Sequence, residues 1–205
     1  MKKRTKFAAI LVMTLVALAG CYPQGPDFIE DLDTVLTHFR DGYDFSAKLT
    51  YARPDQIVKV TGNLEEGDTP TYIPDAVAAP ILARIDQNMA ALGYQKVDIS
   101  ADPDLVLPVA SWEATTIYYY YDYWSYWWGG YYPYWGWGYP PYVSSYTTGT
   151  LFMGLVDPTL ESANGNILFQ WTGAGSGILT SSFSPARVNS AIDRAFAQSP
   201  YLKTN

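Results

Sequence analysis

The spacing of apolar residues predicts two amphipathic helices. The first is expected to begin between Pro74 and Pro80 and to end at Gly93, because glycine suits the position just past a helix end. Its apolar face consists of residues three to four apart: Val77, Ile81, Ile85, Met89 and Leu92. The second is predicted to have Ser184 as its N-cap and Pro185 in its first turn, and to end before Pro200. Its apolar face consists of Val188, Ile192 and Phe196.

Strands are predicted where β-branched and aromatic residues are frequent or alternate with polar ones. The predicted strands cover residues 33–39, 43–52, 56–61, 104–110, 148–156 and 166–176. The first of them also fits helical spacing, but its β-branched residues favour a strand. Turns are expected at Asp41-Gly42 and at Asn164-Gly165, and the latter would make the last two strands an antiparallel hairpin. Pro108 indicates an edge or a bulge in its strand.

The order of these elements is β, β, α, β, a long insertion, β, β, α, which predicts an α+β fold. We expect a mixed, mostly antiparallel sheet with two helices packed on one face and a long aromatic insertion. Residues 33–205 are long enough for a single domain with one core.

The N-terminus has the pattern of an export signal. Four basic residues precede an uncharged run of fourteen residues, whereas a membrane-spanning helix needs about 20. The run ends in Leu18-Ala19-Gly20-Cys21, which resembles the lipobox of bacterial lipoproteins. We therefore predict a signal peptide over residues 1–20, lipid attachment at Cys21 and a tether over residues 21–32. Tyr22 stands where an aspartate would signal retention in the inner membrane, so the outer membrane is expected; the leaflet stays open.

Composition excludes several kinds of site and partner. Without the signal the chain has nine basic and 20 acidic residues, a net charge of −11, which argues against nucleic acid as a partner. Cys21 is the only cysteine, so the chain has no intrachain disulfide and no thiolate metal site. The sequence predicts no cofactor and no metal site.

Residues 118–142 contain eleven tyrosines and five tryptophans and only one charge, at Asp122. This aromatic segment could be a low-complexity loop, a binding surface, or a structural layer over the sheet. In the layer interpretation, its rings would cover the small residues Gly173, Gly175 and Gly177 of the last strand. In the binding interpretation, it contacts a saccharide, peptidoglycan or an envelope protein. The candidate binding residues are Trp124, Trp127, Trp128, Trp135 and Trp137.

An enzymatic function is the less favoured alternative. His38, the only histidine, lies in a predicted strand without a nucleophile motif and is expected to be a surface residue of that strand. Paired carboxylates could still hydrolyse a saccharide in the cell envelope. The acids that flank the aromatic segment are Glu113, Asp122, Asp157 and Glu161.

Several motifs together resemble a known family. They are Tyr43-Asp44-Phe45-Ser46-Ala47-Lys48-Leu49-Thr50-Tyr51-Ala52, Leu92-Gly93-Tyr94, Asp102-Pro103-Asp104-Leu105-Val106, Gly149-Thr150-Leu151, Val156-Asp157 and Phe169-Gln170-Trp171-Thr172-Gly173. In this order, after a lipobox, they resemble the bacterial lipoproteins of domain of unknown function 4136. The resemblance covers residues 33–200 and implies a lipid-anchored envelope domain without an assigned activity. Leu49 departs from the pattern, since a basic or polar residue is more usual there.

Overall fold

A computed structural model describes residues 33–60, 70–112, 136–137, 149–161, 166–180 and 183–204. The chain divides into two compact units, Met1–Leu32 and Asp33–Asn205, and all the described residues belong to the second unit. The predicted signal peptide, Cys21 and the tether therefore lie outside the described residues.

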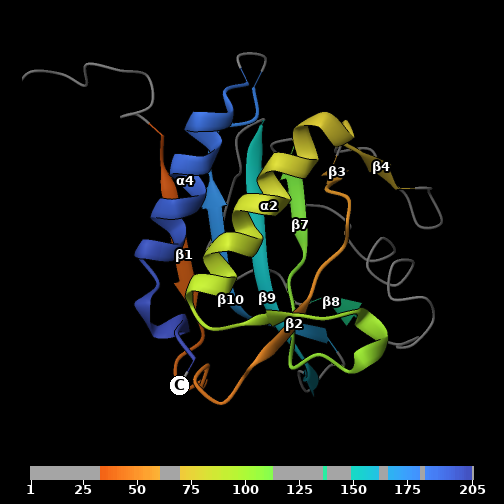
Figure 1. The fold of residues 1–205 in the computed structure, drawn as a ribbon, viewed down its shortest axis with the longest axis vertical. Helices are drawn as coiled ribbons and strands as arrows, with labels where there is room; N and C mark the ends of the chain where they lie inside the picture. The colour runs from red at the N-terminus through yellow and green to blue at the C-terminus, as the bar shows by residue number, and fades with distance from the viewer. Residues whose placement is uncertain are drawn as a thin grey trace, which may run out of the picture. The chain divides into compact units, whose positions relative to one another are not determined.

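The centre of the sheet is the hairpin of β9 (Thr150–Glu161) and β10 (Asn166–Gly175), which pair antiparallel (Figure 1). β1 (Val35–Phe39) pairs antiparallel with the other side of β10. β8 (Gly136–Trp137) pairs parallel with β10 at Asn166 and Ile167. The predicted hairpin and the predicted first strand are confirmed.

The other side of β9 pairs with two short rows of strands. In one row β7 (Val109–Trp112) pairs with β9, β3 (Val58–Val60) with β7, and β4 (Thr71–Tyr72) with β3.

The second row joins β9 through β6 (Leu105–Val106), followed by β2 (Thr50–Ala52) and β5 (Gln95–Lys96). Over the described strands, five pairings are antiparallel and four are parallel. The sheet is thus mixed and the fold is α+β, as predicted, but neither strand direction dominates the pairings.

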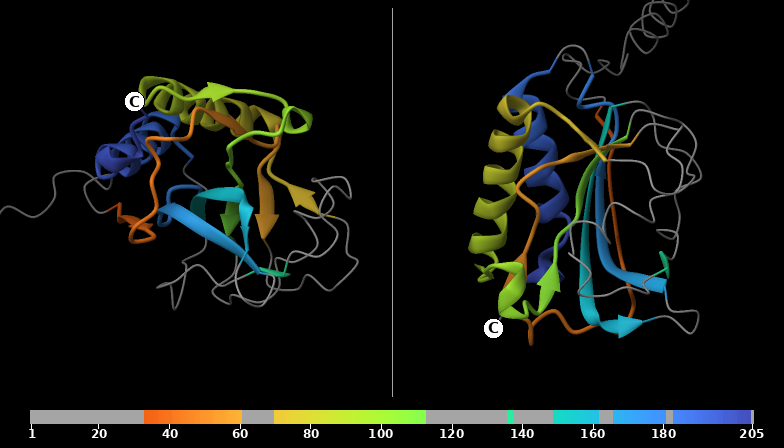
Figure 2. Two further views of the ribbon diagram at one scale, coloured as in Figure 1. Left: turned by 90° about the horizontal axis from the view of Figure 1, so that it is seen from below. Right: turned by 90° about the vertical axis from the view of Figure 1, so that its right-hand side faces the viewer.

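Both predicted helices are present and pack on one face of the sheet (Figure 2). The predicted helices are α2 (Asp75–Ala91) and α4 (Pro185–Ala197). The described chain also contains two short 3-10 helices, η2 (Ile99–Ala101) and η3 (Pro200–Leu202). The Ser184 hydroxyl accepts a hydrogen bond from the backbone N–H of Arg187, which confirms the predicted N-cap. No helix in the described part of the chain combines the length and apolar character needed to cross a membrane.

The helices and the sheet enclose the main hydrophobic core. Its fully buried members from β9 are Leu151, Met153 and Leu155, which alternate along the strand and so point to the same face. The helices contribute Ile81, Leu82, Ile85, Met89, Val188, Ala191, Ile192, Ala195 and Phe196. Each such side chain stabilises the fold by about 1.5–3 kcal/mol through burial if it is as large as leucine.

Two of the predicted strands are wrong in extent. Residues 43–49 are not a strand, because the Asp44 carboxylate accepts hydrogen bonds from the backbone N–H and the hydroxyl of Ser46 and so closes a turn. The predicted strand 104–110 is divided at Leu107-Pro108 into β6 and β7. Pro108 marks this break, and neither part is an edge strand, since β6 pairs with both β9 and β2, and β7 pairs with both β9 and β3.

The layer interpretation, in which aromatic rings of residues 118–142 cover the glycines of β10, does not hold at Gly173 and Gly175. The pairing of β10 with β9 shifts register between Ile167 and Phe169 and again between Phe169 and Trp171, which indicates β-bulges. As a result Phe169 packs against Phe152, whereas Trp171 belongs to the core below the helices. The glycine track at Gly173 and Gly175 therefore faces the helices, and Trp171 and Ile178 fill it.

Candidate functional site

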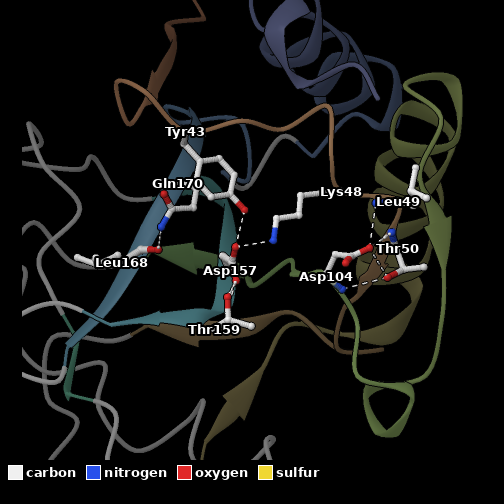
Figure 3. Close-up of polar contacts among 9 residues, drawn as sticks. All are labelled: Tyr43, Lys48, Leu49, Thr50, Asp104, Asp157, Thr159, Leu168 and Gln170. Carbon is white, nitrogen blue, oxygen red and sulfur yellow. Dashed lines mark hydrogen bonds and ion pairs between the residues drawn. The ribbon is translucent and has the colours of Figure 1, made fainter. Parts of the chain in front are cut away.

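The candidate site lies where the connection between β1 and β2, residues 40–49, passes Asp157 of β9 and Gln170 of β10 (Figure 3). The carboxylate of Asp157 in β9 holds the middle of this connection. Its Oδ2 accepts hydrogen bonds from the Tyr43 hydroxyl and from Lys48 Nζ, each at 2.8 Å. Its Oδ1 accepts from the backbone N–H of Thr159 at 2.9 Å and from the Thr159 hydroxyl at 2.6 Å.

A second carboxylate holds the end of the connection. Oδ2 of Asp104, directly before β6, accepts hydrogen bonds from the backbone N–H groups of Leu49 and Thr50 and from the Thr50 hydroxyl, all at 2.9 Å. The Thr50 hydroxyl in turn accepts from the backbone N–H of Asp104 at 3.0 Å. The connection is thus fixed by two acids that are 53 residues apart in the sequence.

These contacts set the charge of the groups involved. Burial disfavours the ionised form of Asp157, but hydrogen bonds from Lys48, Thr159 and Tyr43 outweigh it and lower the pKa of the carboxyl. Burial, together with the hydrogen bond to Asp157, raises the pKa of Tyr43. A carboxylate that is ionised and accepts four hydrogen bonds is suited to positioning the connection, and it is a poor general acid.

A pocket of about 310 Å³ opens beside this network. Its described lining comes from three parts of the chain: the end of β1 and the turn after it, the end of β9, and β10. The lining residues are Arg40, Asp41, Gly42, Tyr43, Leu160, Leu168 and Gln170. The turn is closed by a hydrogen bond from the Tyr43 N–H to the Arg40 carbonyl oxygen. It needs glycine at position 42, because the φ of Gly42 is +79°, a conformation that other residues rarely adopt.

Gln170 is the unusual member of the pocket. Its side chain is fully buried, and its Nε2 donates to the backbone oxygen of Leu168 at 2.9 Å. Its Oε1 accepts no hydrogen bond from the part of the chain that the structure describes. An unpaired buried acceptor costs about 1–3 kcal/mol. Because Oε1 is itself covered, a bound donor reaches it only when the side-chain amide turns toward the pocket.

The pocket combines three kinds of contact. Gln170 provides an acceptor, Oε1, that has no donor among the described residues, the Arg40 guanidinium supplies donors, and Leu160 and Leu168 provide apolar surface. Their arrangement can orient a small ligand that has both hydroxyl or amide groups and an apolar face.

The predicted site residues fall mostly outside the described residues. These are Cys21, the predicted site of lipid attachment, the binding candidates Trp124, Trp127, Trp128 and Trp135, and the acids Glu113 and Asp122. Trp137 and Glu161 are described only by their backbones, in β8 and β9. His38 lies in β1 opposite Thr172 and is partly exposed. Asp157 is the one predicted acid whose side chain is described, and its partners are a lysine, a tyrosine and a threonine.

No local pattern in the sequence identifies Arg40 and Gln170 as residues that line a pocket. Gln170 lies between Phe169 and Trp171, so simple alternation places it on a solvent-facing side; the bulges bury it instead. Tyr43 and Asp157 belong to motifs that indicate the family, but the contact between them spans 114 residues and has no local signal.

The family can be stated from the match of the chain to known proteins. The sequence model of the family described as "Domain of unknown function (DUF4136)" matches residues 35–201. The chain belongs to this family. None of the curated proteins matches it at a significant level.

One solved structure agrees with this assignment. A DUF4136 family protein from Bacteroides thetaiotaomicron has 28% sequence identity and a TM-score of 0.61, over 83% of this chain and 97% of that chain. A PelC variant from Paraburkholderia phytofirmans, solved as a dodecamer, has 15% identity and a TM-score of 0.39, over 84% and 98% of the two chains. A PDZ domain protein from Parabacteroides distasonis has 16% identity and a TM-score of 0.40, over 82% and 36%. The last two likenesses are too distant to inform function.

Proposed function

We propose that this DUF4136 protein is a lipid-anchored protein of the cell envelope whose domain binds a ligand in the pocket at Gln170 and catalyses no reaction. The observation that carries the proposal is the buried Oε1 of Gln170, which accepts no hydrogen bond from the described residues although Gln170 lines a pocket. The lipobox ending at Cys21 supports the anchor, which would be in the outer membrane.

The ligand class that fits best is an uncharged saccharide. A sugar hydroxyl or an acetamido N–H can donate to Gln170 Oε1, and further hydroxyls can accept from the Arg40 guanidinium. The C–H face of a pyranose ring can lie against Leu160 and Leu168. The pocket volume of about 310 Å³ is at the lower end of the range for small-ligand sites, which suits one sugar ring better than a long chain.

The test uses the mature chain in which Cys21→Ser removes the lipid anchor. Soluble peptidoglycan disaccharides and a panel of neutral disaccharides are titrated while the side-chain amide resonances of Gln170 are followed by NMR. We expect one sugar class to shift these resonances. If no sugar shifts them, saccharide is the wrong ligand class.

Two variants place the ligand in the pocket. Gln170→Leu should weaken binding at least tenfold without lowering the melting temperature greatly, because it removes the unpaired buried acceptor together with its donor. Gln56→Leu, at an exposed position before β3, is the matched control and should bind as the parent does. Equal affinity of the Gln170→Leu variant and the parent would show that the ligand binds elsewhere.

A further inference from the structure

β1 forms an open edge of the sheet (Figure 1). It pairs with β10 on one side and with no other strand in the described part of the chain. On the paired side, the N–H of Arg40 donates to the carbonyl oxygen of Gln170 at 2.9 Å. Because hydrogen-bonded residues alternate along an antiparallel strand, the N–H and C=O groups of Val35, Thr37 and Phe39 point away from β10. None of these outward groups bonds to another described residue.

This edge lacks the features by which proteins protect their open strands. Such features are short length, charged residues, proline and bulges. The other described strands with a single partner, β4, β5 and β8, have only two residues each. β1 has five residues, VLTHF, without a lysine, arginine, acid or proline, and its register with β10 is uninterrupted. Leu36 and Phe39, on opposite faces of the strand, are 54% and 38% exposed. The edge is therefore suited to the addition of another strand.

The sequence of β1 is complementary to itself. In an antiparallel pair of two copies with the two-fold axis at Thr37, each Thr37 faces the other. Val35 then faces Phe39 of the second copy, and Leu36 faces His38. The outward backbone groups of one strand thus meet those of the other, as an antiparallel ladder requires. A β-branched residue opposite an aromatic one is also a favourable cross-strand pair.

Charge favours this contact over others between two copies. Without the predicted signal the chain has a net charge of −11, so two copies repel each other over most approaches. β1 itself carries no acid. At each end of the pair, Asp33 would lie near Asp41 of the second copy. Arg187 already forms an ion pair with Asp33, and Arg40 precedes Asp41, so the charges at the ends cancel.

We propose that β1 is the interface for a second copy of this chain, which binds edge to edge and continues the sheet across a two-fold axis at Thr37. Such a contact closes at the dimer, because the same edge is used by both copies. A pairing of five residues buries less than the roughly 1,200 Å² of the smaller stable interfaces, so we expect a Kd between about 10 μM and 1 mM. The proposal does not depend on a ligand at Gln170.

Disulfide formation tests the contact directly. Cys21→Ser leaves the mature chain without a cysteine, so Thr37→Cys then supplies its only thiol. In the proposed dimer the two Cα atoms at position 37 are about 5.5 Å apart, which suits a disulfide. In a glutathione redox buffer, dimers should form at least tenfold faster than with Leu49→Cys in the same background. Leu49 is 54% exposed and lies outside β1, so it reports random collisions. Equal rates would overturn the proposal.

Sedimentation velocity provides a second measurement on the Cys21→Ser chain. Its sedimentation coefficient should rise from the monomer toward the dimer as the concentration approaches about 1 mM. Leu36→Lys puts a charge on the edge and should keep the chain monomeric. Leu49→Lys is the matched control, because Leu49 has the same exposed fraction as Leu36, and it should dimerise as the parent does. A parent that stays monomeric, or a Leu36→Lys variant that dimerises equally, would refute the interface.

Discussion

The indole ring of Trp171 lies directly over Gly173, two residues further along the same strand. A Cβ added to Gly173 would be 2.7 Å from Cη2 of that ring, closer than real Cβ contacts allow. The indole is fixed from its other end, since Nε1 donates to the Ser199 hydroxyl at 2.8 Å. The fully buried ring thus connects β10 to the residues after α4 and leaves no space for a side chain at position 173.

We predict that Gly173→Ala destabilises the domain by about 1–3 kcal/mol, because the added methyl group overpacks the core against the indole. The measurement is chemical denaturation of the mature chain. Trp171→Phe, which shortens the ring, should remove much of this penalty in the double variant, giving a favourable coupling energy. Strictly additive effects of the two substitutions would contradict the steric explanation.

The network around Asp157 predicts a dependence of stability on pH. Because hydrogen bonds lower the pKa of Asp157 in the folded state, its stabilisation is complete above the unfolded-state pKa of about 3.9 and is lost as the pH falls through the folded-state value. Asp157→Asn should cost about 1.5–3 kcal/mol at pH 7 and should flatten this acid limb of the stability profile. An unaltered acid limb in the variant would assign the pH dependence to other groups, such as Asp86.

The N-cap of α4 gives a local prediction. Replacing Ser184 with Ala removes the acceptor for the Arg187 N–H and should lower the free energy of unfolding by about 1 kcal/mol. Ser184→Asp retains an acceptor and should be close to neutral. Equal losses in both variants would show that the hydroxyl stabilises the domain by some other contact.

Replacement of Cys21 tests the proposed anchor. In the full chain expressed in a Gram-negative host, Cys21→Ser should abolish labelling by radioactive palmitate and move the protein from the membrane fraction to the soluble periplasmic fraction. A Tyr22→Phe variant is the control and should remain labelled. Retention of the unlabelled variant on the membrane would mean that another part of the chain holds it there.

Elements with local signals could be predicted from the sequence. The spacing of Ile81, Ile85 and Met89 and the N-cap at Ser184 are sufficient for α2 and α4, and alternating residues identify the β9–β10 hairpin. Family motifs indicate that residues 43–52 matter, but the predicted strand is confirmed only over β2 (Thr50–Ala52), since the Asp44–Ser46 turn competes with a strand before it.

The pocket could not be predicted in the same way. Its shape depends on bulges in β10, which rotate Gln170 into the interior, and on contacts from Asp157 and Asp104 to residues far away in the sequence. Such contacts follow from tertiary packing, which local propensity does not encode.

The two carboxylates that fix the connection between β1 and β2 also link ligand affinity to folding. The walls of the pocket come from residues 40–43, Leu160 and residues 168–170, and only the folded domain brings them together. A ligand that binds there therefore has no site on the unfolded chain. At a concentration of 100 times its Kd it would raise the free energy of unfolding by about 2.7 kcal/mol, so the melting temperature becomes a sensor of occupancy for any compound library.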